Sequence, residues 1–129
     1  MDKDDIDKLT RKIIGCAMQV HNTLGNGFQE VIYQRCLAIE LSYKELVFER
    51  EKEMPIFYRN SQVGTRRVDF LIENSVMVEL KAVEKLEAVH KAQTINYCEA
   101  YNIENGLLIN FGNTSLEFKR VYNTIKYGL

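Results

Sequence analysis

Proline and glycine are scarce in this chain: one proline and seven glycines occur among its 129 residues. Such a composition argues against linker-rich or low-complexity organisation. No apolar run approaches the ~20 residues that a membrane-spanning helix requires, and the charged segment Met1–Asp5 lacks the apolar core of a signal peptide. We therefore expect one domain over residues 1–129, without a membrane segment.

A surplus of charge of one sign is absent as well. The 17 lysines and arginines nearly balance the 18 aspartates and glutamates, which leaves a formal net charge of -1. This balance excludes a histone-like coat protein and an acidic disordered tail. It leaves room for a local basic surface, because a sum does not show where the charges lie.

Cysteine is sparse, and its spacing does not suit a metal site. Cys16, Cys36 and Cys98 are odd in number and form no Cys-x-x-Cys pair. Free and mostly buried thiols are typical of proteins in a reducing compartment. The sequence therefore predicts three reduced cysteines in a cytoplasmic protein.

Two periodicities divide the chain into helical and extended parts. Apolar spacing of three to four residues predicts helices over residues 4–23, 28–43 and 84–102. Strands are predicted over residues 46–50, 54–58, 68–72, 76–82, 106–112 and 116–121, and turns over residues 60–65 and 73–75. Pro55 places its strand at a sheet edge or at a strand start. This order predicts an α/β fold with a mixed sheet and packed helices.

The strongest chemical signal lies on the hairpin around residues 73–75. A three-residue turn there places Asp69 directly opposite Glu79, and alternation puts Glu79 and Lys81 on the same face. Two adjacent carboxylates repel unless a cation lies between them, and Mg²⁺ prefers such oxygen ligands. The alternative is a solvated strand face that carries both acids without a metal.

A third carboxylate lies at the start of the second predicted helix. Glu30 shares a stripe with the apolar residues Tyr33, Leu37 and Leu41, where an unpaired charge would be costly. It either leans toward the metal site or completes a capping box with Gly27 as N-cap. The two interpretations are compatible.

Groups that can form hydrogen bonds share one side of the third predicted helix. That side carries Leu86, His90, Gln93 and Tyr97. The opposite side, which suits packing on a sheet, carries Ala88, Ala92 and Ile95. The first stripe either supports a catalytic face and a phosphate backbone or is an ordinary solvated surface.

Taken in order, these motifs resemble the PD-(D/E)xK nuclease superfamily. The resemblance rests on Asp69, on Glu79-Leu80-Lys81 and on the Q-xxx-Y motif that Gln93 and Tyr97 complete. The segments Gly27–Tyr33 and Gly106–Gly112 further resemble the GxxExxY family within it. The match extends over residues 5–122, and Val68 stands where the proline of the superfamily's name would be.

The resemblance implies a restriction-endonuclease-like core, with a mixed β-sheet flanked by α-helices. It implies a Mg²⁺-dependent nuclease, with Mn²⁺ as an alternative ion, that hydrolyses DNA in preference to RNA. Asp69 and Glu79 would be metal ligands, and Glu30 would be a further acidic member of the site.

The same resemblance assigns roles to the remaining polar residues. Lys81 would activate or orient water, and Gln93 and Tyr97 would support the site or contact the nucleic-acid backbone. A phosphate track could be lined by Arg50, Lys52, Arg59, Arg66, Arg67, Lys81, Lys85 and Lys91.

Two other classes of function stay open at this point. The nuclease fold could serve as a catalytically silent module that binds nucleic acid or protein. The chain could also be an assembly protein or a homodimer, held through strand edges or through the aromatic residues Phe118, Tyr122 and Tyr127.

Overall fold

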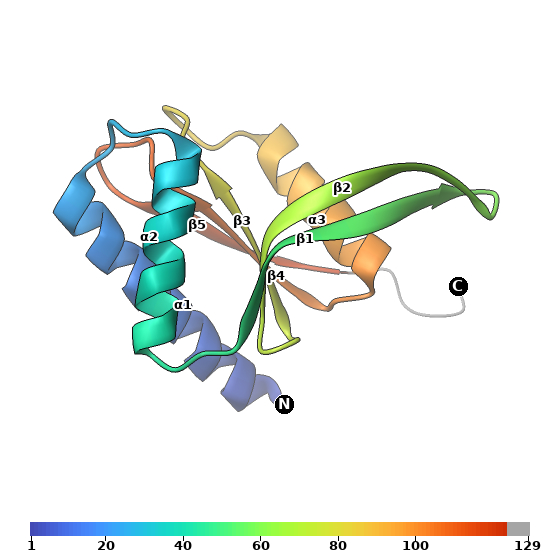
Figure 1. The fold of residues 1–129 in the computed structure, drawn as a ribbon, viewed down its shortest axis with the longest axis horizontal. Coiled ribbons are helices and arrows are strands. Elements are labelled where there is room, and N and C mark those ends of the chain that lie inside the picture. The colour runs from blue at the N-terminus through green and yellow to red at the C-terminus, as the bar shows by residue number, and fades with distance from the viewer. Residues whose placement is uncertain (124–129) are drawn as a thin grey trace.

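The computed structural model describes residues 1–123 (Figure 1). Its elements follow in the order α1 (Lys3–Leu24), α2 (Glu30–Tyr43), β1 (Phe48–Tyr58), β2 (Ser61–Ile72), β3 (Val76–Lys81), α3 (Ala88–Tyr101), β4 (Asn105–Asn110) and β5 (Glu117–Tyr122). The strands form one sheet in the order β1-β2-β3-β4-β5. β3 and β4 run parallel, and the other neighbours are antiparallel, so the expected α/β fold with a mixed sheet is confirmed.

Helices cover both faces of this sheet, with α1 and α2 on one side and α3 on the other (Figure 1). Alternation along β3 explains the two layers of core. Val78 and Leu80 pack toward α1 and α2, whereas Met77 packs with Cys98 of α3. Glu79 and Lys81 lie two and four residues after Met77, so their side chains are on the same face of β3 as that of Met77, the face toward α3.

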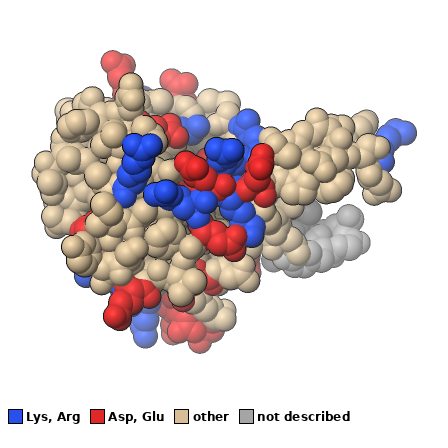
Figure 2. Space-filling model, in the orientation of Figure 1, with Lys and Arg blue, Asp and Glu red and all other residues tan. Residues whose placement is uncertain are grey.

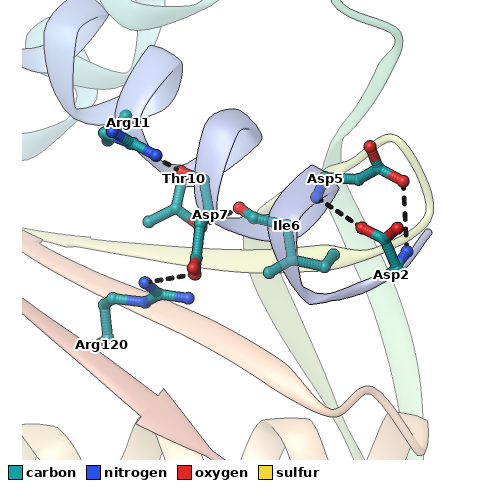
Figure 3. A network of polar contacts seen from close by, with 7 residues as sticks. All are labelled: Asp2, Asp5, Ile6, Asp7, Thr10, Arg11 and Arg120. Carbon is teal, nitrogen blue, oxygen red and sulfur yellow. Dashed lines mark hydrogen bonds and ion pairs between the residues drawn. The ribbon is translucent and has the colours of Figure 1, made fainter.

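The first helix is fixed at its start and against the far edge of the sheet. Asp2 is its N-cap, and the Asp2 and Asp5 side chains each accept the other's backbone N–H in a capping box (Figure 3). Asp7 pairs with Arg120 of β5 at 2.8 Å (Figure 3). α1 is thereby tied to β5, which pairs with the buried strand β4.

The first two predicted strands are one strand, which corrects the expectation. β1 continues through Glu51 and Glu53, because it is an exposed edge strand on which charged side chains reach water. Pro55 lies within it and is tolerated at the edge. The predicted turn over residues 60–65 is also wrong: β2 begins at Ser61, and Arg59 and Asn60 form the turn with positive φ.

One of the two alternatives for Glu30 and the expected start of the third helix are both wrong. α2 begins at Glu30 with Gln29 as N-cap and no side-chain cap, so Gly27 and Glu30 form no capping box. α3 begins at Ala88 rather than at residue 84, and its N-cap is Glu87. The backbone N–H of Glu87 donates to His90 Nδ1. The His90 side chain, which belongs to the predicted polar stripe, therefore caps the start of α3.

The expected packing face of α3 is wrong as well. Ala88 and Ala92 are exposed and Ile95 is half-buried, whereas Thr94, Tyr97 and Cys98 are buried. The reason lies in β4: a Cβ on Gly106 would stand 2.7 Å from Cys98 Sγ and 2.7 Å from a methyl group of Val121. The missing side chain lets the Cys98 face of the helix approach the sheet.

Three further expectations concern compartment and assembly. All three cysteines are free, with Cys16 and Cys98 buried. No helix within residues 1–123 combines the length and apolar content needed to cross a membrane. Phe118 and Tyr122 are exposed, and Tyr127 lies outside the described residues.

Candidate active site

Asp69 and Glu79 face each other where the hairpin of β2 and β3 opens. The predicted turn over residues 73–75 is confirmed by the pairs Ile72↔Val76 and Phe70↔Val78. At the next pair, Asp69 and Glu79, hydrogen bonds from backbone N–H groups to carboxylate side chains replace the backbone–backbone hydrogen bonds of the two strands. The Asp69 N–H donates to Glu79 Oε1 at 3.0 Å, and the Leu80 N–H donates to Asp69 Oδ2 at 2.8 Å.

The β1–β2 ribbon bends at the same place. Glu51 has a left-handed backbone with φ 55, and the β1–β2 register skips the position opposite Asp69. Burial and, to a smaller extent, the Glu51 carboxylate raise the pKa of Asp69, and Glu51 lies 3.9 Å from Arg67. Asp69 therefore stands at a branch point, where the ribbon leaves the sheet and backbone pairing gives way to side chains.

The two carboxylates of this pair lie close together and repel each other when both are ionised. Burial, and then the neighbouring Asp69 carboxylate, raise the pKa of Glu79 to about 8. Burial also raises the pKa of Asp69, against the opposing effect of its hydrogen bonds from Leu80 and Gln34. Only 6% of Glu79 is exposed, so water screens this repulsion poorly.

Gln34 is a site residue that sequence reasoning missed. Its Nε2 donates to Asp69 Oδ1 at 2.7 Å, and the side chain is buried. The spacing offered one signal, because Gln34 lies four residues after Glu30 and thus on the same face of α2. With Leu80 on the second oxygen, Gln34 fixes the orientation of the Asp69 carboxylate.

Glu30 lies at the exposed rim of this cluster, in the first turn of α2. The protein around its carboxylate and the Asp69 charge raise the pKa of Glu30. Tyr33 holds the turn before it: the Tyr33 hydroxyl donates to Gly25 O at 2.6 Å and accepts the Phe28 N–H at 3.1 Å. In the segment Gly27–Tyr33, the tyrosine therefore anchors the loop, and the glutamate is the charged group.

Lys81 and the predicted Q-xxx-Y residues lie on the α3 side. Lys81 Nζ donates to Gln93 Oε1 at 3.4 Å, and its positive charge partly opposes the rise that burial causes in the pKa of Glu30, Asp69 and Glu79. Tyr97 is farther along the helix, where its hydroxyl accepts a hydrogen bond from Arg66 of β2. The structure thus brings Lys81 and Gln93 together, whereas Tyr97 contacts the base of the β1–β2 hairpin.

The segment that follows Lys81 is held by the end of β4. Asn110, fully buried, accepts the Val83 N–H at 3.0 Å and donates to Val83 O at 2.9 Å. A Cβ on Gly112 would stand 2.3 Å from Val83 O, so only glycine fits there. These two residues of the Gly106–Gly112 segment fix the connection between Lys81 and α3, a role that the sequence pattern did not reveal.

The donor set fits a hard divalent cation held by two carboxylates. Glu79 Oε1 is engaged, whereas within residues 1–123 no hydrogen bond reaches Glu79 Oε2. In that same part of the chain, no three His, Cys, Asp or Glu side chains converge into a cage. Mg²⁺ suits such a site, because it takes one or two carboxylates and keeps several waters. Glu30 would then act through a water.

The comparisons with known proteins agree with this geometry. A family model described as the PD-(D/E)XK nuclease superfamily matches residues 7–121. The solved structure titled "Crystal structure of SSO0001" superposes with a TM-score of 0.60 at 19% sequence identity, over 75% of this chain and 52% of that chain. This chain therefore spans about half the length of that protein, and the likeness shows the fold alone. No curated protein sequence matches.

Proposed function

Because the chain belongs to the PD-(D/E)XK nuclease superfamily, we propose that it is a Mg²⁺-dependent nuclease that hydrolyses phosphodiester bonds in DNA, with RNA as the less favoured substrate. Nucleases of this superfamily typically use divalent metals. The observation that carries the proposal is the pair of the half-buried Asp69 and the buried Glu79, with Lys81 on the same face as Glu79. Mn²⁺ is the alternative ion.

Each residue of the site has a distinct task in this proposal. Asp69 and Glu79 would hold the divalent ion, with Glu30 as a third acid through water. The bound ion would supply a polarised phosphoryl oxygen and a water of lowered pKa. Lys81 Nζ, held by Gln93, would orient the attacking water and donate a hydrogen bond to a phosphate oxygen. Gln34 would keep Asp69 in the orientation that leaves room for the substrate.

The experiment is cleavage of plasmid DNA, a labelled oligodeoxynucleotide and a labelled RNA in Mg²⁺, in Mn²⁺ and in EDTA. We expect cleavage of DNA only with a metal, and its loss in Glu79→Gln with the far-UV circular dichroism unchanged. Glu104→Gln, an exposed acid outside the site, is the matched control and should cleave normally. A folded wild-type protein that binds the metal but cleaves none of the substrates contradicts the nuclease assignment.

Finer assignments belong to the same proposal. We place the chain in the GxxExxY family on the strength of Gly27, Glu30 and Tyr33, with Tyr33 anchoring the loop before Glu30. Residues 1–129 would act as one domain. The three free cysteines favour a reducing, cytoplasmic compartment. A homodimer would place one active site on each strand of a DNA duplex, and light scattering measures whether the protein is a monomer or a dimer.

A further inference from the structure

The β1–β2 hairpin continues beyond the body of the molecule as an arm, which we define as residues 54–66 (Figure 1). The arm contains no aspartate or glutamate but two arginines, Arg59 and Arg66, although the whole chain carries 18 acids. Figure 2 shows the arm as largely uncharged, with basic atoms at its far end. The arm is therefore a locally positive projection on a protein of net charge -1.

One face of the arm looks toward α3. Met54 and Ile56 line a cleft between the arm and that helix. The register changes from Ile56↔Gly64 to Phe57↔Gln62, so the extra residue belongs to β2 and alternation along β1 is unbroken. Tyr58 therefore shares the inner face with Met54 and Ile56, and Phe57 points to the outer face. Tyr58 is 66% exposed and Phe57 58%.

The cleft shares Gln93 with the candidate active site. It has a volume of about 610 Å³, and α3 contributes Gln93, Asn96, Tyr97, Glu99 and Ala100 to its wall. Gln93 is the residue whose Oε1 accepts the hydrogen bond from Lys81, so this lining residue of the cleft connects it to the candidate active site. The volume is that of a small-ligand site, which suits one nucleotide and is too small for a duplex.

Arg66 supplies the cleft with a positive charge, and the acid that also lines this cleft, Glu99, lies beyond ion-pair distance of it within residues 1–123. Its guanidinium donates to the Tyr97 hydroxyl and lies over the Tyr97 ring, 5.0 Å from the centroid. In the described part of the chain, no carboxylate lies within ion-pair distance of Arg66. An arginine positioned by a neutral phenol keeps its charge and its remaining donors for a phosphate.

We propose that the cleft and the inner face of the arm bind a single strand of nucleic acid next to the phosphodiester that is cut. Arg66 takes a phosphate, Asn96 and Gln93 contact the nucleotide in the cleft, and Tyr58 stacks on a base farther out. This inference rests on the proposed function and names the substrate class of the same site: nucleic acid with an unpaired flank.

The length of the track follows from the strands. Asp69 and Arg66 are three residues apart on β2, Met54 pairs with Arg66, and Tyr58 lies four residues beyond Met54. Seven strand steps span roughly 23 Å at about 3.3 Å per residue. A stacked strand that advances about 3.4 Å per nucleotide covers this distance with roughly seven nucleotides.

The test is binding of fluorescein-labelled oligodeoxythymidines of increasing length, followed by anisotropy in EDTA so that no cleavage occurs. Affinity should rise with length and level off near seven nucleotides. Tyr58→Ala should weaken binding of the longer oligomers about tenfold, as expected for loss of one stacked base. Phe57→Ala removes a similarly exposed aromatic from the outer face and should bind as the wild type does.

The outcomes separate this inference from the nuclease proposal. Equal affinity of Tyr58→Ala and Phe57→Ala for the oligomers overturns the track. The track is also overturned if Tyr58→Ala binds the oligomers as the wild type does and differs from it only in the mass measured by light scattering, since the arm is then a protein interface. Cleavage in Mg²⁺ is scored separately. If Tyr58→Ala weakens binding but the wild-type protein does not cleave, the track is supported and the nuclease assignment is overturned. If the wild-type protein cleaves but Tyr58→Ala binds as tightly as it does, the nuclease assignment is supported and the track is overturned.

Discussion

The carboxylates of Asp69 and Glu79 bridge two strands that have stopped pairing through their backbones. Glu79 accepts the Asp69 N–H, and Asp69 accepts the N–H of Leu80, the neighbour of Glu79. Each acid therefore satisfies a backbone donor at the point where the strands separate, and the two negative charges are brought together by the hydrogen bonds that hold the branch. A cation is the natural counterpart of this arrangement.

The stability of the metal-free protein should depend on the protonation of Glu79. In the folded chain its pKa is raised to about 8, whereas the ordinary value is 4.5. Between these values the folded state binds more protons than the unfolded state, so the free energy of unfolding falls as pH rises from about 4.5 to about 8. Urea denaturation in EDTA across this interval measures the fall. Glu79→Gln should flatten it, and an equally steep fall in that variant would contradict the assignment.

Gln34 should tune both metal affinity and activity. Replacement by methionine keeps the volume but removes the 2.7 Å hydrogen bond to Asp69 Oδ1. We expect metal affinity or kcat to drop by about 10- to 100-fold, the usual effect of losing a residue that orients a ligand. Calorimetric titration with Mn²⁺ and initial rates give the two numbers. Gln19→Met, on the exposed surface of α1, is the control, and indistinguishable behaviour of the two variants would count against the role of Gln34.

Gly112 should be intolerant of even one added carbon. A Cβ there would stand 2.3 to 2.6 Å from backbone atoms of Ala82 and Val83, and backbone cannot swing aside as a side-chain end can. Gly112→Ala should lower the free energy of unfolding by about 1–3 kcal/mol or more. Gly15→Ala is the matched control, because nothing lies within 4 Å of its Cβ and the residue is within α1. That substitution should stabilise by about 0.5–1 kcal/mol. Thermal denaturation compares the two, and equal shifts would refute the packing argument.

The cysteines should differ in their reaction with iodoacetamide. Burial raises the pKa of the Cys98 thiol to about 12, and burial also raises that of Cys16. Both should stay unmodified in the folded protein, because the thiolate is the reacting form and reagent cannot reach it. Cys36 is half-buried and should react first. Peptide mass spectrometry after a timed reaction gives the order, with denatured protein as the reference, and early labelling of Cys98 would contradict the packing of α3 on β4.

Sequence reasoning predicted the parts of the molecule that depend on local pattern. The turn over residues 73–75 and the hairpin register that continues to Asp69 opposite Glu79 were correct. Its errors lie where tertiary contacts override local signals. The charged residues in the middle of β1 suggested a break between two strands, but an edge strand can carry them because their side chains reach water. The buried face of α3 is set by the space that Gly106 leaves on β4, and not by the apolar residues Ala88, Ala92 and Ile95 of the helix.

Motif spacing and period-two alternation are properties of the chain, and they were enough to predict the PD-(D/E)XK superfamily and the mixed α/β fold. They also supplied the candidate acidic and basic residues of the proposed site. Only the tertiary structure decided that Gln34 holds Asp69, that Asn110 and Gly112 fix the segment after Lys81, and that Arg66 reaches Tyr97. Those contacts join residues that are 27 to 35 positions apart. No local period encodes them, since they exist only once the helices have packed on the twisted sheet.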